Sequence, residues 1–254
     1  MPKKVLVTGS TRGIGKGILE RFHRGNWDVC VSGRSFNQVE DLTNNLNVIR
    51  KNSAIGKAFN LEAKSELIEL SESIKKSWGE LDCIVLNIGS GSGAKGLTAT
   101  FQENEVSTRI NFINVVQQFN FLIDLIKLNS YGGSVVFIGS IAQKVNVNAP
   151  ISYSNSKRAL NVFANYQASI LASRKIRVNV INPGHILTEN GIWDKKRIDD
   201  PEALSVFIGE KIPIGRIGKV GEIAETVFFS ADGPNQNFLV GACIDIDGGT
   251  SLIN

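Results

Sequence analysis

Seven short apolar runs, each separated from the next by a longer segment, constrain the fold of this chain more than any other feature. In most of the longer segments, apolar residues recur every three or four positions, as on one face of a helix. Strands that alternate with helices in this way predict a parallel sheet covered on both faces. The runs lie at residues 4–8, 28–32, 54–59, 81–86, 134–138, 177–181 and 241–246. We therefore expect an α/β fold of three layers, with a seven-stranded parallel sheet in the middle.

The chain has the size and composition of one domain. Its 254 residues suffice to bury a large core, and no linker or repeat divides residues 1–254. The net charge of +4 is small and no basic stripe with interleaved aromatic residues is present, so we expect no nucleic acid partner. No apolar run is long enough to span a membrane, and the first is too short for a signal peptide. We expect a cytoplasmic protein with no membrane partner.

The cysteines and histidines give no sign of a metal site. Cys30, Cys83 and Cys243 each lie within an apolar run, and an odd number without a Cys-x-x-Cys pair argues against disulfides and zinc. We expect all three to be small core residues. His23 is predicted on a face of the first helix, and His185 is interpreted as a solvated loop residue. Without a Gly-x-Ser-x-Gly motif, a serine hydrolase is disfavoured.

A glycine-rich turn joins the first apolar run to the first helical segment. Glycines here permit a sharp turn and a close approach of the backbone to a ligand, and a helix N-terminus attracts phosphate. Between a strand and a helix, this is the phosphate-binding arrangement of a Rossmann fold. The residues predicted to bind a dinucleotide are Gly9, Ser10, Thr11, Arg12, Gly13, Ile14 and Gly15.

An arginine follows the second apolar run, in Gly33-Arg34-Ser35. An NAD enzyme usually has an acidic residue at this point to bind the ribose 2′-hydroxyl, whereas an arginine pairs with the 2′-phosphate of NADP. Arg34, joined by Arg12, therefore predicts NADP(H) in preference to NAD(H). The alternative is that both are solvated surface arginines.

Tyr153 and Lys157 stand four residues apart in a helical segment at 151–173. On a helix they share one face, which places an ammonium beside a phenol. A free tyrosine has a pKa of about 10, and a nearby positive charge lowers that pKa, which suits a general acid or base. A chance pair on an exposed helix is the alternative, because the pattern is short.

Three further segments bear on function. Residues 87–93 form a small-residue loop after the fourth run, where open α/β sheets bind ligands. Residues 101–128 predict one long helix that contains Asn111. Helical periodicity weakens after residue 188, and the segment 189–213, which contains two prolines, is predicted to be a substrate lid.

In this order and spacing, the motifs resemble the short-chain dehydrogenase/reductase family in its single-domain form of about 250 residues. The resemblance covers essentially the whole chain. It rests on the Thr-Gly-x-x-x-Gly-x-Gly turn, Asn-x-Gly at 87–89, Asn111, Ser140 thirteen residues before Tyr153, the Tyr-x-x-x-Lys pair, Pro-Gly-x-x-x-Thr at 183–188 and a terminal Asp-Gly-Gly.

The resemblance implies a role for each residue. Tyr153 would exchange a proton with the substrate oxygen, and Ser140 would hydrogen-bond that oxygen. Lys157 would bind the nicotinamide ribose and lower the Tyr153 pKa, and Asn111 would hold a water. Further cofactor-binding residues would be Asn60, Leu61, Asn87, Gly89, Pro183, Gly184, Ile186 and Thr188.

This chain departs from the family pattern at two positions. Asn60 stands where many relatives have Asp, although its side-chain oxygen can still accept a hydrogen bond from adenine. Ile88 stands where relatives tend to have Ala, which alters packing near the cofactor.

Several substrates fit the resemblance. The overall look is nearest to 3-oxoacyl-acyl carrier protein reductases, through Gly-Arg-Ile-Gly at 215–218. A sugar or polyol dehydrogenase is the alternative, in which Asn190, Trp193 and His185 would supply a more polar pocket. A non-catalytic NADP-binding regulator is disfavoured, because such proteins usually lose the tyrosine or the lysine.

The expected partner is a small carbonyl or alcohol substrate, either free or bound to a carrier protein. Arg174 and Lys175 would meet an acidic carrier, or they serve only as favourable charges at a helix C-terminus. Family members are commonly homotetramers, and a homotetramer or homodimer is expected here. The apolar stripe that suits such an interface, and suits core packing equally well, comprises Phe112, Val115, Val116, Phe119, Leu122 and Ile126.

Overall fold

The computed structural model describes residues 1–60, 63–91, 99–127, 132–232 and 238–253. All seven predicted runs form strands of a single parallel sheet, in the order β3-β2-β1-β4-β5-β6-β9. The α/β Rossmann prediction is confirmed. The bounds are β1 Lys4–Val7, β2 Asp28–Gly33, β3 Ala54–Ala58, β4 Cys83–Leu86, β5 Gly133–Ile138, β6 Ile176–Pro183 and β9 Cys243–Ile246, and a separate pair is formed by β7 Ile186–Leu187 and β8 Gly218–Lys219.

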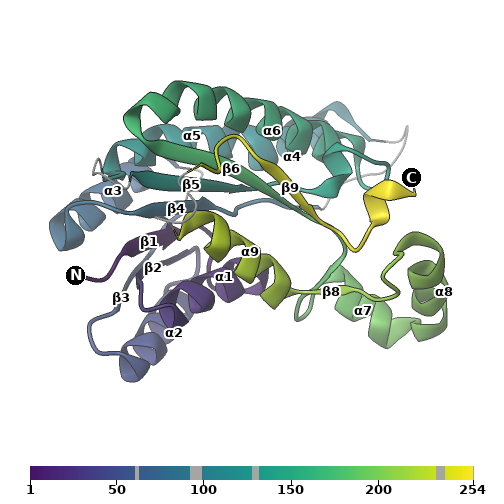
Figure 1. Ribbon diagram of the computed structural model, residues 1–254. Coiled ribbons are helices and arrows are strands. Elements are labelled where there is room, and N and C mark those ends of the chain that lie inside the picture. The colour runs from purple at the N-terminus through teal and green to yellow at the C-terminus, as the bar shows by residue number, and fades with distance from the viewer. Residues whose placement is uncertain (61–62, 92–98, 128–131, 233–237, 254) are drawn as a thin grey trace.

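Helices cover both faces of the sheet (Figure 1). One face carries α1 Gly13–Arg24, α2 Phe36–Ile49 and α9 Val220–Ala231, and the other carries α3 Lys64–Trp78, α4 Phe101–Thr108, α5 Asn114–Leu122 and α6 Ile151–Leu171. Two hydrophobic clusters, one on each side, fill the spaces between sheet and helices. Because the central strands are buried on both faces, they read as continuous apolar runs in the sequence.

The direction of strand succession reverses between β1 and β4. The chain runs outward from β1 to β2 and β3, then returns to place β4 on the other side of β1. Ligands of open α/β sheets bind beyond the carboxyl ends of the strands at such a reversal. Asn87 joins the two ends, because its Nδ2 donates hydrogen bonds to the carbonyl oxygens of Thr8 and Gly9 at 3.1 and 3.2 Å.

The predicted continuous helix at 101–128 is wrong in its continuity. A π-helical turn at Arg109–Ile113 separates α4 from α5, and a 3₁₀ turn at Ile123–Leu125 ends the segment before the gap at 128–131. Asn111 lies within the π turn and is fully buried. Its Nδ2 donates to the Ser107 carbonyl oxygen at 2.9 Å, a bond to the helix itself that helps to hold the irregular turn.

The predicted lid contains two helices, α7 Ile192–Asp199 and α8 Pro201–Lys211, to which the sequence pattern gave no assignment. Asp200 separates them, and its side chain accepts a hydrogen bond from the backbone N–H of Ala203 at 3.0 Å. Both helices protrude from one end of the sheet, away from the N-terminus (Figure 1). Ile198 and Val206 are exposed, which explains the weak apolar periodicity.

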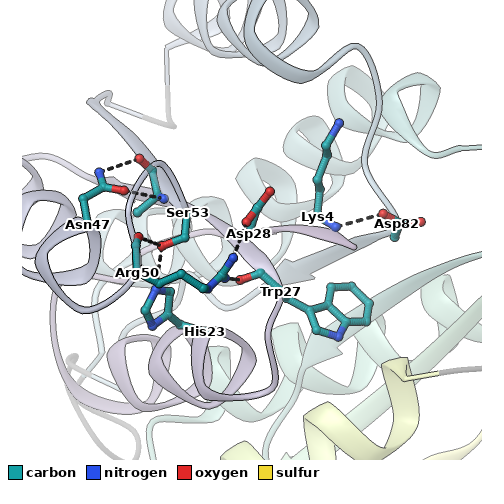
Figure 2. Close-up of polar contacts among 9 residues, drawn as sticks. Lys4, His23, Trp27, Asp28, Asn47, Arg50, Ser53 and Asp82 are labelled. Atoms are coloured by element: carbon teal, nitrogen blue, oxygen red, sulfur yellow. Dashed lines mark hydrogen bonds and ion pairs between the residues drawn. The ribbon is translucent and has the colours of Figure 1, made fainter. Parts of the chain in front are cut away.

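Paired polar groups close the amino end of the sheet (Figure 2). Arg50 makes an ion pair with Asp28 at 2.7 Å and also donates to the Trp27 carbonyl oxygen. His23, on the buried face of α1, shares a hydrogen bond of 2.7 Å with the Ser53 hydroxyl. These contacts tie the ends of α1 and α2 to the beginnings of β2 and β3.

Two of the three cysteines are core residues as expected. Burial raises the pKa of the Cys30 thiol to about 12, and burial also raises that of the Cys83 thiol. The prediction for Cys243 is wrong, because Cys243 is exposed. It begins β9, which is the last strand at one edge of the sheet among the described residues. Within the described residues, no helix combines the length and apolar character that a membrane span requires.

Candidate active site

A cavity of about 590 Å³ lies at the carboxyl ends of the strands, where the strand order reverses. Segments that are distant in the sequence meet around it: the glycine-rich turn, the ends of β2 to β6, and the start of α6. The described residues that line it are Gly9, Thr11, Arg12, Gly13, Ile14, Gly15, Gly33, Arg34, Phe59, Asn60, Asn87, Ile88, Gly89, Ser90, Gly91, Ile110, Ile138, Gly139, Ser140, Tyr153, Lys157, Pro183, Gly184 and Thr188.

Most residues singled out from the sequence as catalytic or cofactor-binding line this cavity, but three of the described ones do not, and a further one lies outside the described residues. Ser10 is buried, and its hydroxyl accepts a hydrogen bond from the backbone N–H of Ser32 at 3.0 Å, which fastens the glycine turn to β2. Ile186 packs into the core beyond the cavity. Asn111 supports the wall from behind, and Leu61 lies outside the described residues.

Several lining residues were not singled out in the sequence as cofactor-binding residues. They are Gly33, Phe59, Ile110, Ile138 and Gly139, together with Ile88, Ser90 and Gly91, which the sequence marked only as part of the loop at 87–93. Most of them stand within one or two residues of a predicted site residue, at the end of a strand. Proximity to a strand's carboxyl end was therefore the available signal. Ile110 does not follow a strand. It stands next to Asn111 and reaches the cavity from the π turn.

The glycine turn forms a cradle that larger residues would fill. A Cβ on Gly15 would lie 2.3 Å from the carbonyl oxygen of Gly9, and Gly9 and Gly13 have φ values of +64° and +56°. The backbone can therefore approach a ligand here only because these positions are glycine. The start of α1 adds free N–H groups that favour a phosphate. The cradle fits the diphosphate of a dinucleotide.

The charged residues among the described lining residues of the cavity are all basic. Arg12, Arg34 and Lys157 line it, and no Asp or Glu is among its described lining residues. Arg12 and Arg34 are exposed, and both stand where the glycine turn meets the end of β2. Three cations without a carboxylate favour an anionic ligand with several phosphate groups.

The three groups proposed for proton transfer lie together. The Ser140 side chain hydrogen-bonds Tyr153, and the Lys157 ammonium lies 5.9 Å from the centroid of the Tyr153 ring. Lys157 is buried, and its Nζ donates to the Ile138 carbonyl oxygen at 2.9 Å. Each side chain is thus held by its surroundings in the lining of the cavity.

Burial is the largest influence on the pKa values of Tyr153 and Lys157. Desolvation raises the pKa of the Tyr153 phenol, and the hydrogen bond from Ser140 only partly opposes it. The net shift of the Tyr153 pKa is therefore upward, and the lowering expected from Lys157 does not set its direction. Desolvation also lowers the pKa of Lys157 to about 8. At neutral pH the Tyr153 phenol keeps its proton, and the Lys157 side chain is charged in most of the molecules.

Asn111 holds the loop beside Lys157 by two backbone contacts. Its Oδ1 accepts from the Ser90 N–H at 2.8 Å, and its Nδ2 donates to the Ser90 carbonyl oxygen at 3.0 Å. The adjacent Gly89 is confined, because a Cβ there would lie 3.1 Å from the Lys157 Nζ. The loop therefore passes close to Lys157, and Asn111 fixes its course.

His185 is not the solvated loop residue that the sequence suggested. Its side chain is buried, and its ring centroid lies 4.8 Å from that of Trp193 and 5.1 Å from that of Phe207. The prediction was wrong because the two aromatic partners belong to α7 and α8, whose packing against His185 the sequence pattern did not reveal. Within the part of the chain that is described, no three or more His, Cys, Asp or Glu residues gather as a metal site would require.

Known proteins share this architecture over the full chain. The family model of short chain dehydrogenases matches residues 3–197. Glucose 1-dehydrogenase 2 from Bacillus subtilis is 32% identical, over 98% of this chain and 95% of that protein. The 3-oxoacyl-[acyl-carrier-protein] reductase FabG from Buchnera aphidicola is 27% identical, over 97% and 96%.

A solved structure also has this fold. The RhlG/NADP active-site complex from Pseudomonas aeruginosa superposes with a TM-score of 0.89 at 26% identity, over 98% of this chain and 96% of that chain. The motifs and the parallel sheet agree with these matches. The chain belongs to the short-chain dehydrogenase/reductase family of oxidoreductases.

Proposed function

We propose that this protein transfers a hydride between the nicotinamide of NADP(H) and a carbonyl or secondary-alcohol substrate, with Tyr153 as general acid and base. One observation carries the proposal: the glycine cradle and the Ser140, Tyr153 and Lys157 side chains line a single cavity. Family membership supports the reaction class, and the similarity to an NADP complex supports the cofactor.

The cradle would hold the cofactor phosphates, Arg12 and Arg34 its 2′-phosphate, and Lys157 with Gly184 its nicotinamide end. When bound, the nicotinamide supplies or accepts the hydride. Tyr153 holds its proton at neutral pH and can give it to the oxygen of a carbonyl that is being reduced.

Two neighbours support the proton transfer. The Ser140 hydroxyl, already hydrogen-bonded to Tyr153, is placed to orient the same substrate oxygen. The nearby Lys157 ammonium favours the phenolate that remains once the proton has left. The lid formed by α7 and α8 would close over the substrate and exclude water.

The preference for NADP(H) rests on Arg34. We expect Arg34→Asp to lower the ratio of NADPH to NADH affinity by about 10- to 100-fold, because a hydrogen bond to a charged group contributes about 1.5–3 kcal/mol. Fluorescence titration with both cofactors measures the ratio, and Arg24→Asp, at an exposed site at the end of α1, is the matched control. An unchanged ratio in the Arg34 variant would show that Arg34 does not read the 2′-phosphate.

Two substrate classes fit this reaction: acyl thioesters, as the FabG similarity suggests, and sugars or polyols, as the glucose dehydrogenase similarity suggests. NADPH oxidation in the presence of acetoacetyl thioesters, keto-sugars and steroids distinguishes them. NADPH binding without turnover of any carbonyl would favour a non-catalytic regulator instead. Arg174 and Lys175 are exposed at the end of α6, where a carrier protein would meet them.

A homotetramer or homodimer in the cytoplasm is also proposed. Val115, Phe119, Leu122 and Ile126 of the apolar stripe lie in the core, so the stripe serves mainly for packing. The outer face of α6 nevertheless exposes three apolar or aromatic side chains, and these suit a contact with a second copy: Val162, Tyr166 and Ile170.

A further inference from the structure

A buried asparagine contacts Ser140 but is not among the described residues that line the cavity. Asn182 stands near the end of β6 and is fully buried, although asparagine is depleted in strands. A buried amide is costly unless its hydrogen-bonding groups find partners. β6 lies between β5 and β9 in the sheet, so partners can come from both sides.

The Asn182 amide uses all of its hydrogen-bonding positions. Its Oδ1 accepts from the Ser140 N–H at 3.2 Å and from the Asn161 Nδ2 at 3.3 Å. Its Nδ2 donates to the Asp245 Oδ1 at 3.0 Å and to the Asn161 Oδ1 at 3.4 Å. An amide has two acceptor positions on its oxygen and two donors on its nitrogen. The orientation of the amide is fixed as well, because a backbone N–H only donates and a carboxylate only accepts.

Asn182 bridges the two elements that carry the reacting groups. Ser140 follows the end of β5, whereas Tyr153 and Lys157 lie on α6. Asn161, also on α6, is buried, and its Nδ2 donates to the Lys157 carbonyl oxygen at 2.9 Å as well as to Asn182. One side chain on β6 is thereby hydrogen-bonded to Ser140 and, through Asn161, to the helical turn of Lys157.

A glycine beside Ser140 makes room for this amide. A Cβ on Gly139 would lie 2.0 Å from the Asn182 Oδ1, which is too close for any side chain. Gly139 also donates its N–H to the Ile181 carbonyl oxygen at 2.8 Å, so the chain cannot withdraw without breaking a bond between β5 and β6. The absence of a side chain at position 139 therefore lets the Asn182 amide reach the Ser140 N–H.

Asp245 and Lys144 hold the segment that follows Ser140. The Asp245 Oδ2 lies 3.1 Å from the Lys144 Nζ, and its Oδ1 accepts from Asn182. Lys144 directly follows the 3₁₀ turn Ile141–Gln143. The segment from Ser140 to Lys144 is therefore attached at both ends, by its first N–H to β6 and by its last side chain to β9. The ion pair is partly exposed, so it is expected to contribute less than Asn182.

We infer that Asn182 is a positioning residue for the proposed proton transfer. The Ser140 Oγ accepts from the Ala142 N–H at 3.2 Å, so the place of the hydroxyl follows from the backbone that Asn182 holds. The same hydroxyl is hydrogen-bonded to Tyr153. Without the amide, the Ser140 N–H and the Asp245 carboxylate each lose a partner, and the hydroxyl and the phenol can separate. The inference rests on the proposed function and adds a residue outside the described lining of the cavity.

Two alanine variants on the same strand test the inference. Asn182→Ala should lower kcat about 10- to 100-fold and leave NADPH affinity near the wild-type value, because a small misplacement of reacting groups slows the chemical step. Asn179→Ala is the matched control. Asn179 is buried on β6, and its amide bonds the Leu239 carbonyl oxygen and the Ala242 N–H, both at 2.9 Å. Urea unfolding should show a loss of stability in both variants, whereas kcat should fall only in Asn182→Ala.

A paired exchange separates positioning from stability. Asn182→Asp keeps an acceptor for the Ser140 N–H but loses the donor to Asp245 and sets two carboxylates at hydrogen-bonding distance, so kcat should fall. Adding Asp245→Asn supplies the missing donor from the other side, and the double variant N182D/D245N should recover most of kcat. Because the exchange conserves size and total charge, it tests the inference even where Asn182→Ala does not fold.

NADPH oxidation measures kcat with whichever acetoacetyl thioester, keto-sugar or steroid the wild-type enzyme reduces. A wild-type kcat in Asn182→Ala, or an equal fall in Asn179→Ala, would overturn the inference and leave the proposed function intact. A double variant no more active than Asn182→Asp would also count against it. NADPH binding without reduction of any of these carbonyls by the wild-type enzyme would instead overturn the proposed function, and the role of Asn182 with it.

Discussion

The two ends of the central sheet differ in whether their charged side chains are paired with opposite charges. At the carboxyl end, Arg12, Arg34 and Lys157 line a cavity that has no carboxylate among its described lining residues. At the amino end, Arg50 pairs with Asp28 at 2.7 Å, as Figure 2 shows. The difference teaches that one end leaves its charges for ligands, whereas the other neutralises its charges within the protein.

Buried bases show the same contrast. Burial lowers the pKa of Lys157 to about 8, so this lysine remains largely charged at neutral pH. At the other end, burial lowers the pKa of His23, the nearby Arg50 lowers it further, and Asp28 opposes both. His23 is therefore neutral at the same pH. Desolvation acts at both ends, but Lys157 keeps its charge at neutral pH whereas His23 does not.

The largest effect is expected at the carboxyl end. Tyr153→Phe removes only the hydroxyl, so NADPH affinity should stay near the wild-type value while kcat falls by about 10²- to 10⁴-fold, the usual contribution of a general acid. Steady-state kinetics and fluorescence titration measure the two quantities. Tyr166→Phe, at an exposed site on the same helix, is the control and should leave kcat unchanged. Full turnover in the Tyr153 variant would place the acid elsewhere.

An intermediate effect is expected at the amino end, on stability. Asp28→Asn leaves Arg50 without its ion-pair partner and should lower the free energy of unfolding by about 1–2 kcal/mol, since the pair is only partly exposed. Urea unfolding measures the loss, and Asp41→Asn at an exposed position of α2 is the control. A loss of turnover without a loss of stability would remove the distinction between the two ends.

The smallest effect concerns pH. Because the pKa of His23 is lowered in the folded state, the unfolded chain binds more protons than the folded protein below the unfolded value of about 6.5. Stability should therefore fall as the pH falls through this window. His23→Gln removes the titrating group, so its unfolding free energy should change less between about pH 7.5 and about pH 5. An equal slope in both proteins would assign the acid sensitivity to other groups.

The sequence was sufficient for the sheet and for most of the cavity lining. The apolar runs at β4 and β5 could be read directly, because strands buried on both faces contain few polar residues. The glycine turn and the Tyr-x-x-x-Lys pair could also be recognised in the sequence, since their residues lie close together in the chain. Local patterns therefore predicted what local geometry decides.

Features that depend on distant contacts could not be read in this way. Cys243 lies in an apolar run but at the sheet edge, and position in the sheet follows from topology. His185 is covered by Trp193 and Phe207, which pack against it from α7 and α8. The pKa of Tyr153 follows from desolvation by the folded surroundings, which the i, i+4 spacing to Lys157 does not reveal.

The π turn at Arg109–Ile113 has a consequence for how this segment tolerates changes in length. The Asn114 N–H bonds the Arg109 carbonyl oxygen, five residues back, so the turn contains one residue more than an α-helical turn would. Deleting a single residue here would let the helix wind regularly through the site. The amide of Asn111 would then rotate away from Ser90, and the loop beside Lys157 would lose its anchor without any change to an active-site side chain.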